Sequence, residues 1–208
     1  MQADRFVVCG AGGHAKVVVA TIEAAGGQVV RVLDDDPAVH GRRILGHLVE
    51  GPITEDLVPT GSLVVLAIGS ARGRMVVASR LRAAFGAVIH PGAAVHASVL
   101  IGPGSVVFAG AVIQPEARVG QHVIVNTGAS VDHDCVLGDF VHVAPGVHLA
   151  GDVRLEIGAF MGIGSCALPG SRIGAWATVG AGGVVLGEIP PGVTAIGVPA
   201  RVVGTGRP

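Results

Sequence analysis

An aliphatic residue recurs at every sixth position from Ile89 to Leu149, and this repeat constrains the fold more than any other feature of the sequence. A second small or apolar residue follows each of these by four positions, as Ala129 follows Val125 and Cys135 follows Val131. A period of six fits neither the helical repeat of about 3.6 residues nor the two-residue alternation of a half-buried strand. It is typical of a parallel β-helix, in which three hexads close one turn.

The repeat is less regular after Leu149. The next isoleucines, Ile157 and Ile163, are displaced by two positions, and the original spacing resumes at Ile173. We interpret this displacement as a slip that pushes loops out of the coil, and the segment around Gly151 is predicted to be such a loop.

Composition agrees with a narrow solenoid core. Half of the 208 residues are hydrophobic, but aromatic residues make up 3% and tyrosine is absent, so Val, Ile, Leu and Ala must fill the interior. The formal net charge of -1, with scattered Lys and Arg, gives no reason to expect a nucleic-acid partner. The sequence shows no signal segment and no apolar run of about 20 residues, which predicts a cytoplasmic protein without a membrane span. Three cysteines lack metal-ligand spacing and are interpreted as small hydrophobic residues of a reducing compartment: Cys9, Cys135 and Cys166.

The first part of the chain has a different pattern, alternating strands and helices. Predicted strands at 5–9 and 29–33 are joined through a predicted helix at 17–25, and a third predicted strand at 63–68 is followed by a predicted helix at 72–85. Two strands connected by a helix favour a parallel arrangement. The sequence therefore predicts a small Rossmann-like α/β domain over residues 1–86, followed by the β-helix domain over residues 87–208.

Glycines and acids gather where these strands end. Ligands of parallel sheets bind at the carboxyl ends of the strands, where glycine lets backbone N–H groups and a helix N-terminus approach a phosphate. The pattern Gly-x-Gly-x-x-Ala is weak by itself, and a tight turn without a ligand is an alternative. A dinucleotide is a competing ligand, but the domain has about half the size that a dinucleotide fold needs, so one nucleotide fits better. The residues at the strand ends are Gly10, Gly12, Gly13, Asp34, Asp35 and Gly69.

A second group of functional residues lies in the β-helix. Because Val131 and Cys135 occupy inward positions, His133 and Asp134 must lie at the corner between them and face outward. An imidazole with a pKa near 6.5 accepts a proton at neutral pH, and an adjacent carboxylate stabilises the imidazolium. The pair is therefore predicted to act in general-base catalysis, while the inward Cys135 is rejected as a nucleophile.

The segments from Gly10 to Lys16, from Val32 to Asp35 and from Ala67 to Gly69 resemble the opening domain of bacterial sugar acetyltransferases of the PglD/NeuD kind. The likeness extends from Phe6 to Arg201 and implies a left-handed β-helix, a hexapeptide-repeat acyltransferase. In that family the small domain holds the nucleotide of a nucleotide-linked amino sugar. Ala15 and the additional Asp36 depart from the family pattern and bear on which base is bound. The resemblance implies nucleotide contacts from Gly12, Gly13, His14, Asp34, Asp35 and Gly69.

The resemblance also implies the roles of residues in the β-helix. His133 would be the general base and Asp134 its supporting acid, and acetyl-CoA would lie in a groove between coils. Flat apolar faces favour association, and the family arrangement is a homotrimer whose active sites lie between subunits. No metal is expected. The implied acetyl-CoA contacts are His142, Gly151 as the oxyanion donor, Ile163, Ala181 and Arg201.

Several functions stay open on these residues. The favoured reaction is acetylation of the 4-amino group of a UDP- or GDP-linked amino sugar for bacterial surface glycans. A sugar hydroxyl is the alternative acceptor, as in sialic acid O-acetylation, because the motif near His133 does not separate the two. A zinc site of the γ-carbonic-anhydrase type would need converging histidines, and His142 and His148 are expected on different faces of the coil. A nucleotide-binding scaffold without catalysis is the remaining alternative.

Overall fold

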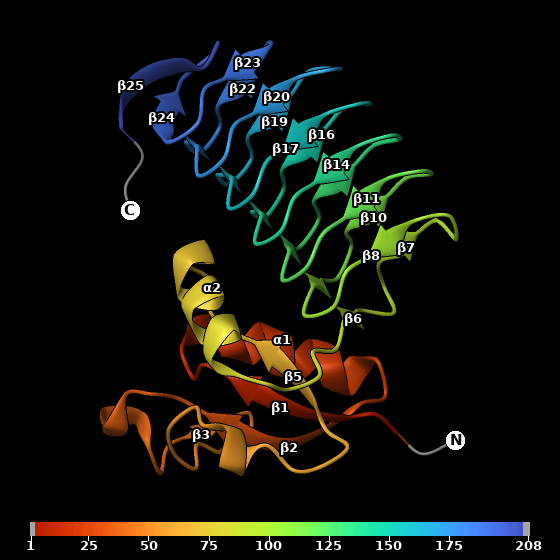
Figure 1. The fold of residues 1–208 in the computed structure, drawn as a ribbon. Coiled ribbons are helices and arrows are strands. Elements are labelled where there is room, and N and C mark those ends of the chain that lie inside the picture. The colour runs from red at the N-terminus through yellow and green to blue at the C-terminus, as the bar shows by residue number, and fades with distance from the viewer. Residues whose placement is uncertain (1–2, 206–208) are drawn as a thin grey trace. The chain divides into compact units, whose positions relative to one another are not determined.

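The computed structural model describes residues 3–205, which form two compact units divided in sequence between Pro91 and Gly92 (Figure 1). The first unit contains a three-stranded parallel sheet in the order β2-β1-β5. Its strands are β1 (Arg5–Cys9), β2 (Gln28–Leu33) and β5 (Leu63–Leu66). Helix α1 (Gly13–Ala24) joins β1 to β2, and α2 (Ala71–Arg80) follows β5.

Short elements complete the first unit. They are η1 (Pro37–Val39), β3 (Arg43–Ile44), β4 (His47–Leu48), η2 (Glu55–Leu57) and β6 (Val88–Ile89). The central strand β1 is almost entirely buried, so its apolar run from Phe6 to Cys9 forms the middle of the core. No helix in the described part of the chain combines the length and apolar character needed to cross a bilayer.

The second helix of this unit is shorter than the sequence suggested. The apolar pattern predicted a helix over 72–85, but α2 ends at Arg80 because Leu81 has an extended backbone with φ -104° and ψ 125°. The chain then runs beside β5, where Phe85 forms a parallel bridge with Val64. The residues after Arg80 therefore extend the sheet edge instead of the helix.

The second unit is a β-solenoid built from strands of two residues (Figure 1). Three rows of parallel strands form its three faces. Face 1 comprises β7 (Ala94–Val95), β10 (Val112–Ile113), β13 (Ser130–Val131), β16 (His148–Leu149), β19 (Cys166–Ala167) and β22 (Val184–Val185). Face 2 comprises β8 (Leu100–Ile101), β11 (Arg118–Val119), β14 (Val136–Leu137), β17 (Arg154–Leu155), β20 (Arg172–Ile173) and β23 (Glu188–Ile189). Face 3 includes β9 (Val106–Val107), β12 (Ile124–Val125), β15 (His142–Val143), β18 (Phe160–Met161), β21 (Thr178–Val179), β24 (Val193–Ile196) and the antiparallel β25 (Arg201–Thr205).

The pairing of these strands confirms a coil of three hexads. Residues 18 apart stack on one another, as Val131 does on Leu149 and Val143 on Met161. The second residue of each strand points inward, so Val125, Val131 and Leu137 belong to one continuous core. The fold class predicted from the repeat, an α/β domain followed by a parallel β-helix, is therefore confirmed.

The predicted slip after Leu149 is wrong. Leu155, Met161 and Ala167 occupy the inward positions between Leu149 and Ile173, so the period of six continues without interruption. Ile157 and Ile163 lie at corners and are 39% and 62% exposed. The error arose because two exposed isoleucines resemble core residues in sequence, whereas Met161 and Ala167 are less obvious members of an aliphatic ladder.

Two leucine substitutions on face 2 test which positions of a strand point into the core and which point outward. Replacing the buried Leu137 with Ala is expected to destabilise the fold by about 2–5 kcal/mol, because it leaves a cavity in a narrow core. Leu100 is the matched control, since it points outward on face 2 and is 65% exposed. Leu100→Ala should change the free energy of unfolding by less than about 1 kcal/mol in denaturant titrations. Equal losses in the two variants would contradict the register.

Candidate functional site

The glycine turn after β1 is shaped by close backbone packing. Gly10 has φ +109°, and a Cβ there would lie 2.8 Å from the carbonyl oxygen of Ala67. Only glycine fits this left-handed, crowded position. By contrast, a Cβ on Gly12, Gly13 or Gly69 would meet no atom within 4 Å. These three glycines therefore border open space, as residues that let a ligand approach the backbone should.

Asp34 organises this turn through its own hydrogen bonds. Its carboxylate accepts the backbone N–H of Ala11 at 2.6 Å and that of Asp36 at 2.8 Å. Its carbonyl oxygen lies 2.8 Å from Nε2 of His40, and its N–H donates to Gly51. A residue predicted to contact the nucleotide thus ties together three loops at the strand ends.

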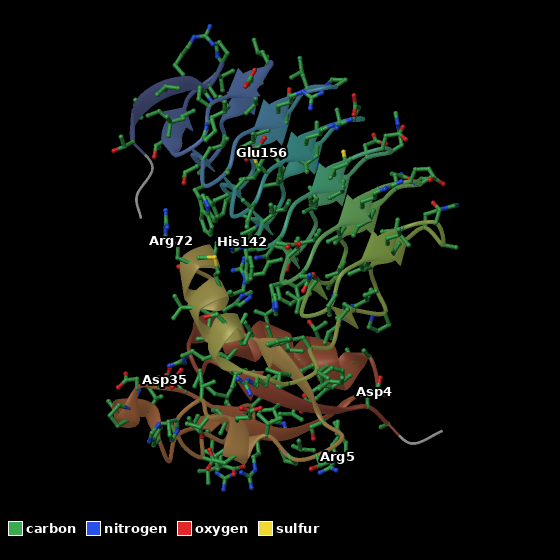
Figure 2. All side chains as sticks on the ribbon, in the orientation of Figure 1. Asp4, Arg5, Asp35, Arg72, His142 and Glu156 are labelled. Atoms are coloured by element: carbon green, nitrogen blue, oxygen red, sulfur yellow. The ribbon has the colours of Figure 1, made fainter. Side chains whose placement is uncertain are left out.

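Asp35, labelled in Figure 2, forms an ion pair with Arg80 at the end of α2. Its other carboxylate oxygen accepts the N–H of Ile53 at 2.9 Å. Burial by itself would raise the pKa of Asp35, but the hydrogen bonds from Arg80 and Ile53 outweigh it and hold this pKa below 3.8. The side chain is therefore an anion at neutral pH.

Sequence reasoning missed the buried Arg74 beside the predicted nucleotide contact His14. Arg74 is 1% exposed, and its guanidinium donates to the carbonyl oxygens of Ile68 and Gly69 at 2.9 and 2.8 Å. Burial lowers the pKa of Arg74 to about 10. Burial, followed by the charge of Arg74, lowers the pKa of His14 to about 4. His14 is thus a neutral imidazole, able to hydrogen-bond a ligand without adding charge.

His133 and Asp134 lie at the corner between face 1 and face 2, outside the core as the register predicted. Nδ1 of His133 is 2.8 Å from a carboxylate oxygen of Asp134. Asp132 accepts the backbone N–H of His133 at 2.8 Å. The hydrogen bond with Asp134 is the main reason that the pKa of His133 is raised above 6.5, with smaller contributions from the charges of Asp132, Asp134 and Asp152.

Gly151 stacks directly on this pair, one coil further on. The N–H of Asp152 donates to the carbonyl oxygen of His133 at 3.0 Å, so the two corners are in register. A Cβ at position 151 would lie 2.5 Å from Cε1 and 2.6 Å from Nε2 of the His133 ring. Gly151 therefore occupies an ordinary corner, not an extruded loop, and any larger residue would displace the imidazole.

Cys135 points into the core, as the register predicted. It is fully buried, and its thiol donates to the carbonyl oxygen of Ala150 at 3.1 Å. Burial is the main reason that its pKa is raised to about 11. A thiol of this kind is neither accessible nor ionised at neutral pH, which agrees with its rejection as a nucleophile.

The other residues predicted to bind the cofactor lie elsewhere on the solenoid. His142 projects from β15 on face 3, with Nε2 3.4 Å from the side-chain nitrogen of Asn126 (Figure 2). Ile163 and Ala181 share the corner between face 3 and face 1, and Arg201 begins β25. Of the five residues predicted to bind the cofactor, Gly151 is the one that lies directly against His133 within one chain.

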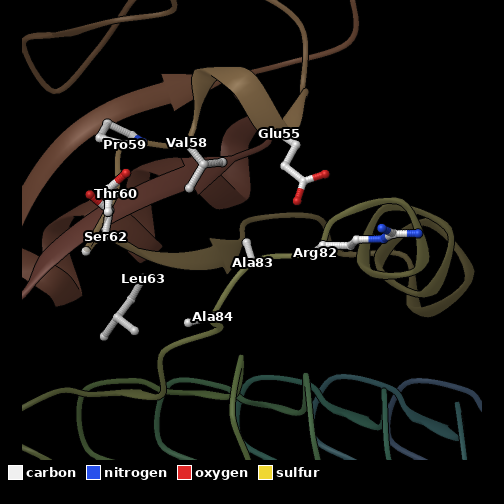
Figure 3. A pocket seen from close by; sticks show the side chains of 10 residues that line it. Glu55, Val58, Pro59, Thr60, Ser62, Leu63, Arg82, Ala83 and Ala84 are labelled. Carbon is white, nitrogen blue, oxygen red and sulfur yellow. The ribbon is translucent and has the colours of Figure 1, made fainter.

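A pocket of about 380 Å³ in the first unit contains none of the predicted site residues (Figure 3). It lies at the amino end of β5, whereas the glycine turn lies at the carboxyl ends of the strands. Its lining is formed by Glu55, Val58, Pro59, Thr60, Gly61, Ser62, Leu63, Arg82, Ala83 and Ala84. Within residues 3–205 of one chain, no three side chains of His, Cys, Asp or Glu are arranged to hold a metal.

Comparison with known proteins decides the family. Residues 5–81 match the PglD N-terminal domain. The acetyltransferase domain of PglB from Neisseria gonorrhoeae is 38% identical, with a TM-score of 0.89 over 96% of this chain and 99% of that one. The chain belongs to the PglD-type acetyltransferases. A second member, perosamine N-acetyltransferase from Caulobacter crescentus, is 40% identical, with a TM-score of 0.88 over 96% of both chains.

Other curated acetyltransferases match only a short segment of this sequence. Serine acetyltransferase from Escherichia coli K12 is 45% identical over 51 residues, which are 24% of this chain. The match spans about a fifth of that relative's length. This likeness accordingly concerns a short segment of a PglD-type chain.

The effect of Asp134 on His133 can be measured directly. Removing a carboxylate that hydrogen-bonds the imidazolium disfavours the charged form, so Asp134→Asn should lower the pKa of His133. An NMR titration of the imidazole resonances measures this value in both proteins. Asp139→Asn is the matched control, because Asp139 accepts an N–H from Gln121 at a different corner. An unchanged His133 pKa in Asp134→Asn would contradict the assignment.

Proposed function

We propose that this protein transfers the acetyl group of acetyl-CoA to the 4-amino group of a UDP- or GDP-linked amino sugar. The product would serve the synthesis of bacterial surface glycans, and the reaction would take place in the cytoplasm. The observation that carries the proposal is the hydrogen-bonded pair of His133 and Asp134 at an open corner of the solenoid, stacked on Gly151. A positioned base of this kind is what a neutral amine needs when it attacks a thioester.

In the proposed mechanism His133 acts through Nε2. The hydrogen bond to Asp134 keeps the proton on Nδ1, so Nε2 carries the lone pair. As the amine nitrogen attacks the thioester carbonyl, Nε2 takes a proton from that nitrogen. The tetrahedral intermediate then collapses with cleavage of the carbon–sulfur bond, and the imidazolium returns the proton to the leaving thiolate. No covalent intermediate on the enzyme is required.

Gly151 is proposed to stabilise the developing oxyanion with its backbone N–H. It lies beside the imidazole ring, where the carbonyl oxygen of the thioester would be placed during attack. One such donor contributes roughly 3–4 kcal/mol of transition-state stabilisation in comparable sites. Because Gly151 has no side chain, its N–H can be approached by the substrate, and the imidazole ring of His133 has room beside it.

The first unit is proposed to hold the nucleotide part of the acceptor. Its support is the open space beside Gly12, Gly13 and Gly69, together with the neutral His14 and the buried guanidinium of Arg74. A helix N-terminus with open backbone at the same edge favours a phosphate group. Asp34 is proposed to support this site by holding the glycine turn.

Relatives of the same family support the choice of substrates. The PglB acetyltransferase domain has been solved in complex with acetyl coenzyme A. Perosamine N-acetyltransferase has been solved with CoA and GDP-perosamine. Both relatives cover the full length of this chain closely, so an amine on a nucleotide-linked sugar is the acceptor that we favour over a hydroxyl group.

A homotrimer is part of the proposal. His133 and Gly151 lie at one corner, whereas His142, Ile163 and Ala181 lie on another face and another corner of the same solenoid. In a trimer, a neighbouring copy would place its His142, Ile163 and Ala181 beside His133 and Gly151 of the first copy. We expect light scattering after size-exclusion chromatography to give three times the mass of one chain, and a monomeric, fully active enzyme would refute this arrangement.

The base is tested by thiol release from acetyl-CoA in the presence of UDP-, GDP- and dTDP-linked 4-amino sugars. His133→Ala should lower kcat/KM by at least about a hundredfold, because it removes general-base catalysis. In the wild type, kcat/KM should fall as the pH decreases through the raised pKa of His133, because only neutral imidazole accepts a proton.

His96→Ala is the control for this experiment, since His96 lies near the same corner two coils earlier and its ring hydrogen-bonds Ser98. It should leave kcat/KM unchanged. Turnover of a sugar hydroxyl, with none of the amino sugars acetylated, would replace the proposed acceptor. Equal activity of His133→Ala and the wild type would exclude His133 as the base.

A further inference from the structure

The pocket at the amino end of β5 is separate from the residues of the proposed reaction (Figure 3). Its volume of about 380 Å³ is in the range of small-molecule sites. All of its lining residues lie between Glu55 and Ala84, inside the first unit. The site is therefore complete within that unit.

Much of the lining is apolar. Val58 and Ala83 pack against the core of the first unit, and Leu63 begins β5. Pro59 and Ala84 complete this apolar surface. Because a ligand that covers such a surface removes it from water, the pocket favours a molecule with an apolar ring or chain.

A buried hydroxyl group lies in the same lining. Ser62 is 6% exposed, and its Oγ has no hydrogen-bond partner among residues 3–205. The backbone N–H of Ser62 is already used in the turn before β5, where it donates to the carbonyl oxygen of Pro59 at 3.0 Å. Buried hydroxyl groups without a partner are rare in folded proteins, since each loses its hydrogen bonds with water. A ligand with a hydroxyl group at this end of the pocket would supply the partner.

Two opposite charges line the other end of the pocket. Figure 3 shows Glu55 and Arg82 on one side and Thr60 and Ser62 on the other. Glu55 begins η2, and Arg82 follows α2 by two residues. Both side chains are exposed, and in the described part of the chain neither of them forms an ion pair. A ligand that carries an anionic and a cationic group at this end is complementary to both.

We propose that this pocket binds a free α-amino acid whose side chain is apolar along most of its length and ends in a hydroxyl group, as in tyrosine. An α-amino acid carries its two charges on one carbon atom, so the ammonium group pairs with Glu55 and the carboxylate with Arg82. The aromatic ring lies on the apolar lining, and the phenol reaches Ser62. A tyrosine inside a peptide lacks both charges, so the pocket selects the free amino acid.

The test is isothermal titration calorimetry of the full chain with L-tyrosine, up to the solubility limit of the amino acid. One tyrosine should bind per chain. L-phenylalanine, which lacks the hydroxyl group, should bind about threefold to tenfold more weakly. Ser62→Ala should lower the affinity for tyrosine to that for phenylalanine and leave phenylalanine binding unchanged.

Each charge is tested with an analogue that lacks the matching group. Tyramine has no carboxylate, and 3-(4-hydroxyphenyl)propanoate has no ammonium group. Arg82→Gln should weaken tyrosine binding about fivefold or more and leave tyramine binding unchanged. Glu55→Gln should weaken tyrosine binding to a similar extent and leave binding of the propanoate unchanged. Asp56→Asn is the matched control, because Asp56 follows Glu55 in η2 but does not line the pocket.

A wild type without saturable binding of tyrosine would overturn this inference. Equal affinities of the wild type for tyrosine and phenylalanine would also overturn it, as would tyrosine binding that is unchanged in Glu55→Gln and Arg82→Gln. An equal loss in Asp56→Asn would have the same consequence, since the effect would then be one of general surface charge. None of these titrations measures acetyl transfer, so their outcome is independent of the proposed function.

Discussion

The stacking of residues 18 apart is the constraint on which the second unit depends. Backbone N–H groups of one coil donate to carbonyl oxygens of the next, and the inward side chains of successive coils contact each other in the same order. Such a ladder fixes each outward side chain relative to its neighbours above and below. It is why His133 is placed over Gly151, and why Asp134 belongs to a column of carboxylates instead of being an isolated acid.

The same constraint explains how much of this unit could be predicted from sequence. A period of six assigns every residue to the core, a strand face or a corner, so the inward Cys135 and the outward His133 followed from counting. The method failed after Leu149 because it relied on residue type. Ile157 and Ile163 are exposed at corners, and Met161 and Ala167 fill the core. In this segment the period of six and the residue type give different inward positions, and the hydrogen-bonded coils keep the positions that the period of six predicts.

The first unit shows what sequence cannot provide. The strands, the glycine turn and the acids at the strand ends could be located from local patterns, and the helix over 72–85 was overextended by five residues. The hydrogen bond from the backbone N–H of Ala11 to the carboxylate of Asp34 could not be predicted from local patterns, because the two residues are 23 positions apart in the sequence. Arg74 gave no signal at all, since an arginine in a short helix is normally exposed, and only the folded chain turns it toward Ile68 and Gly69.

The carboxylates around His133 have a physical consequence for catalysis. In the single chain the imidazole is 61% exposed, and Asp134 with its acidic neighbours raises its pKa. Binding of two large substrates would remove water from the ring, and loss of water by itself lowers the pKa of a histidine. The acids oppose that change, because they stabilise the imidazolium most strongly when the local dielectric constant falls. We infer that the carboxylates keep His133 basic at the moment when the substrates cover it, which is when the amine must lose its proton.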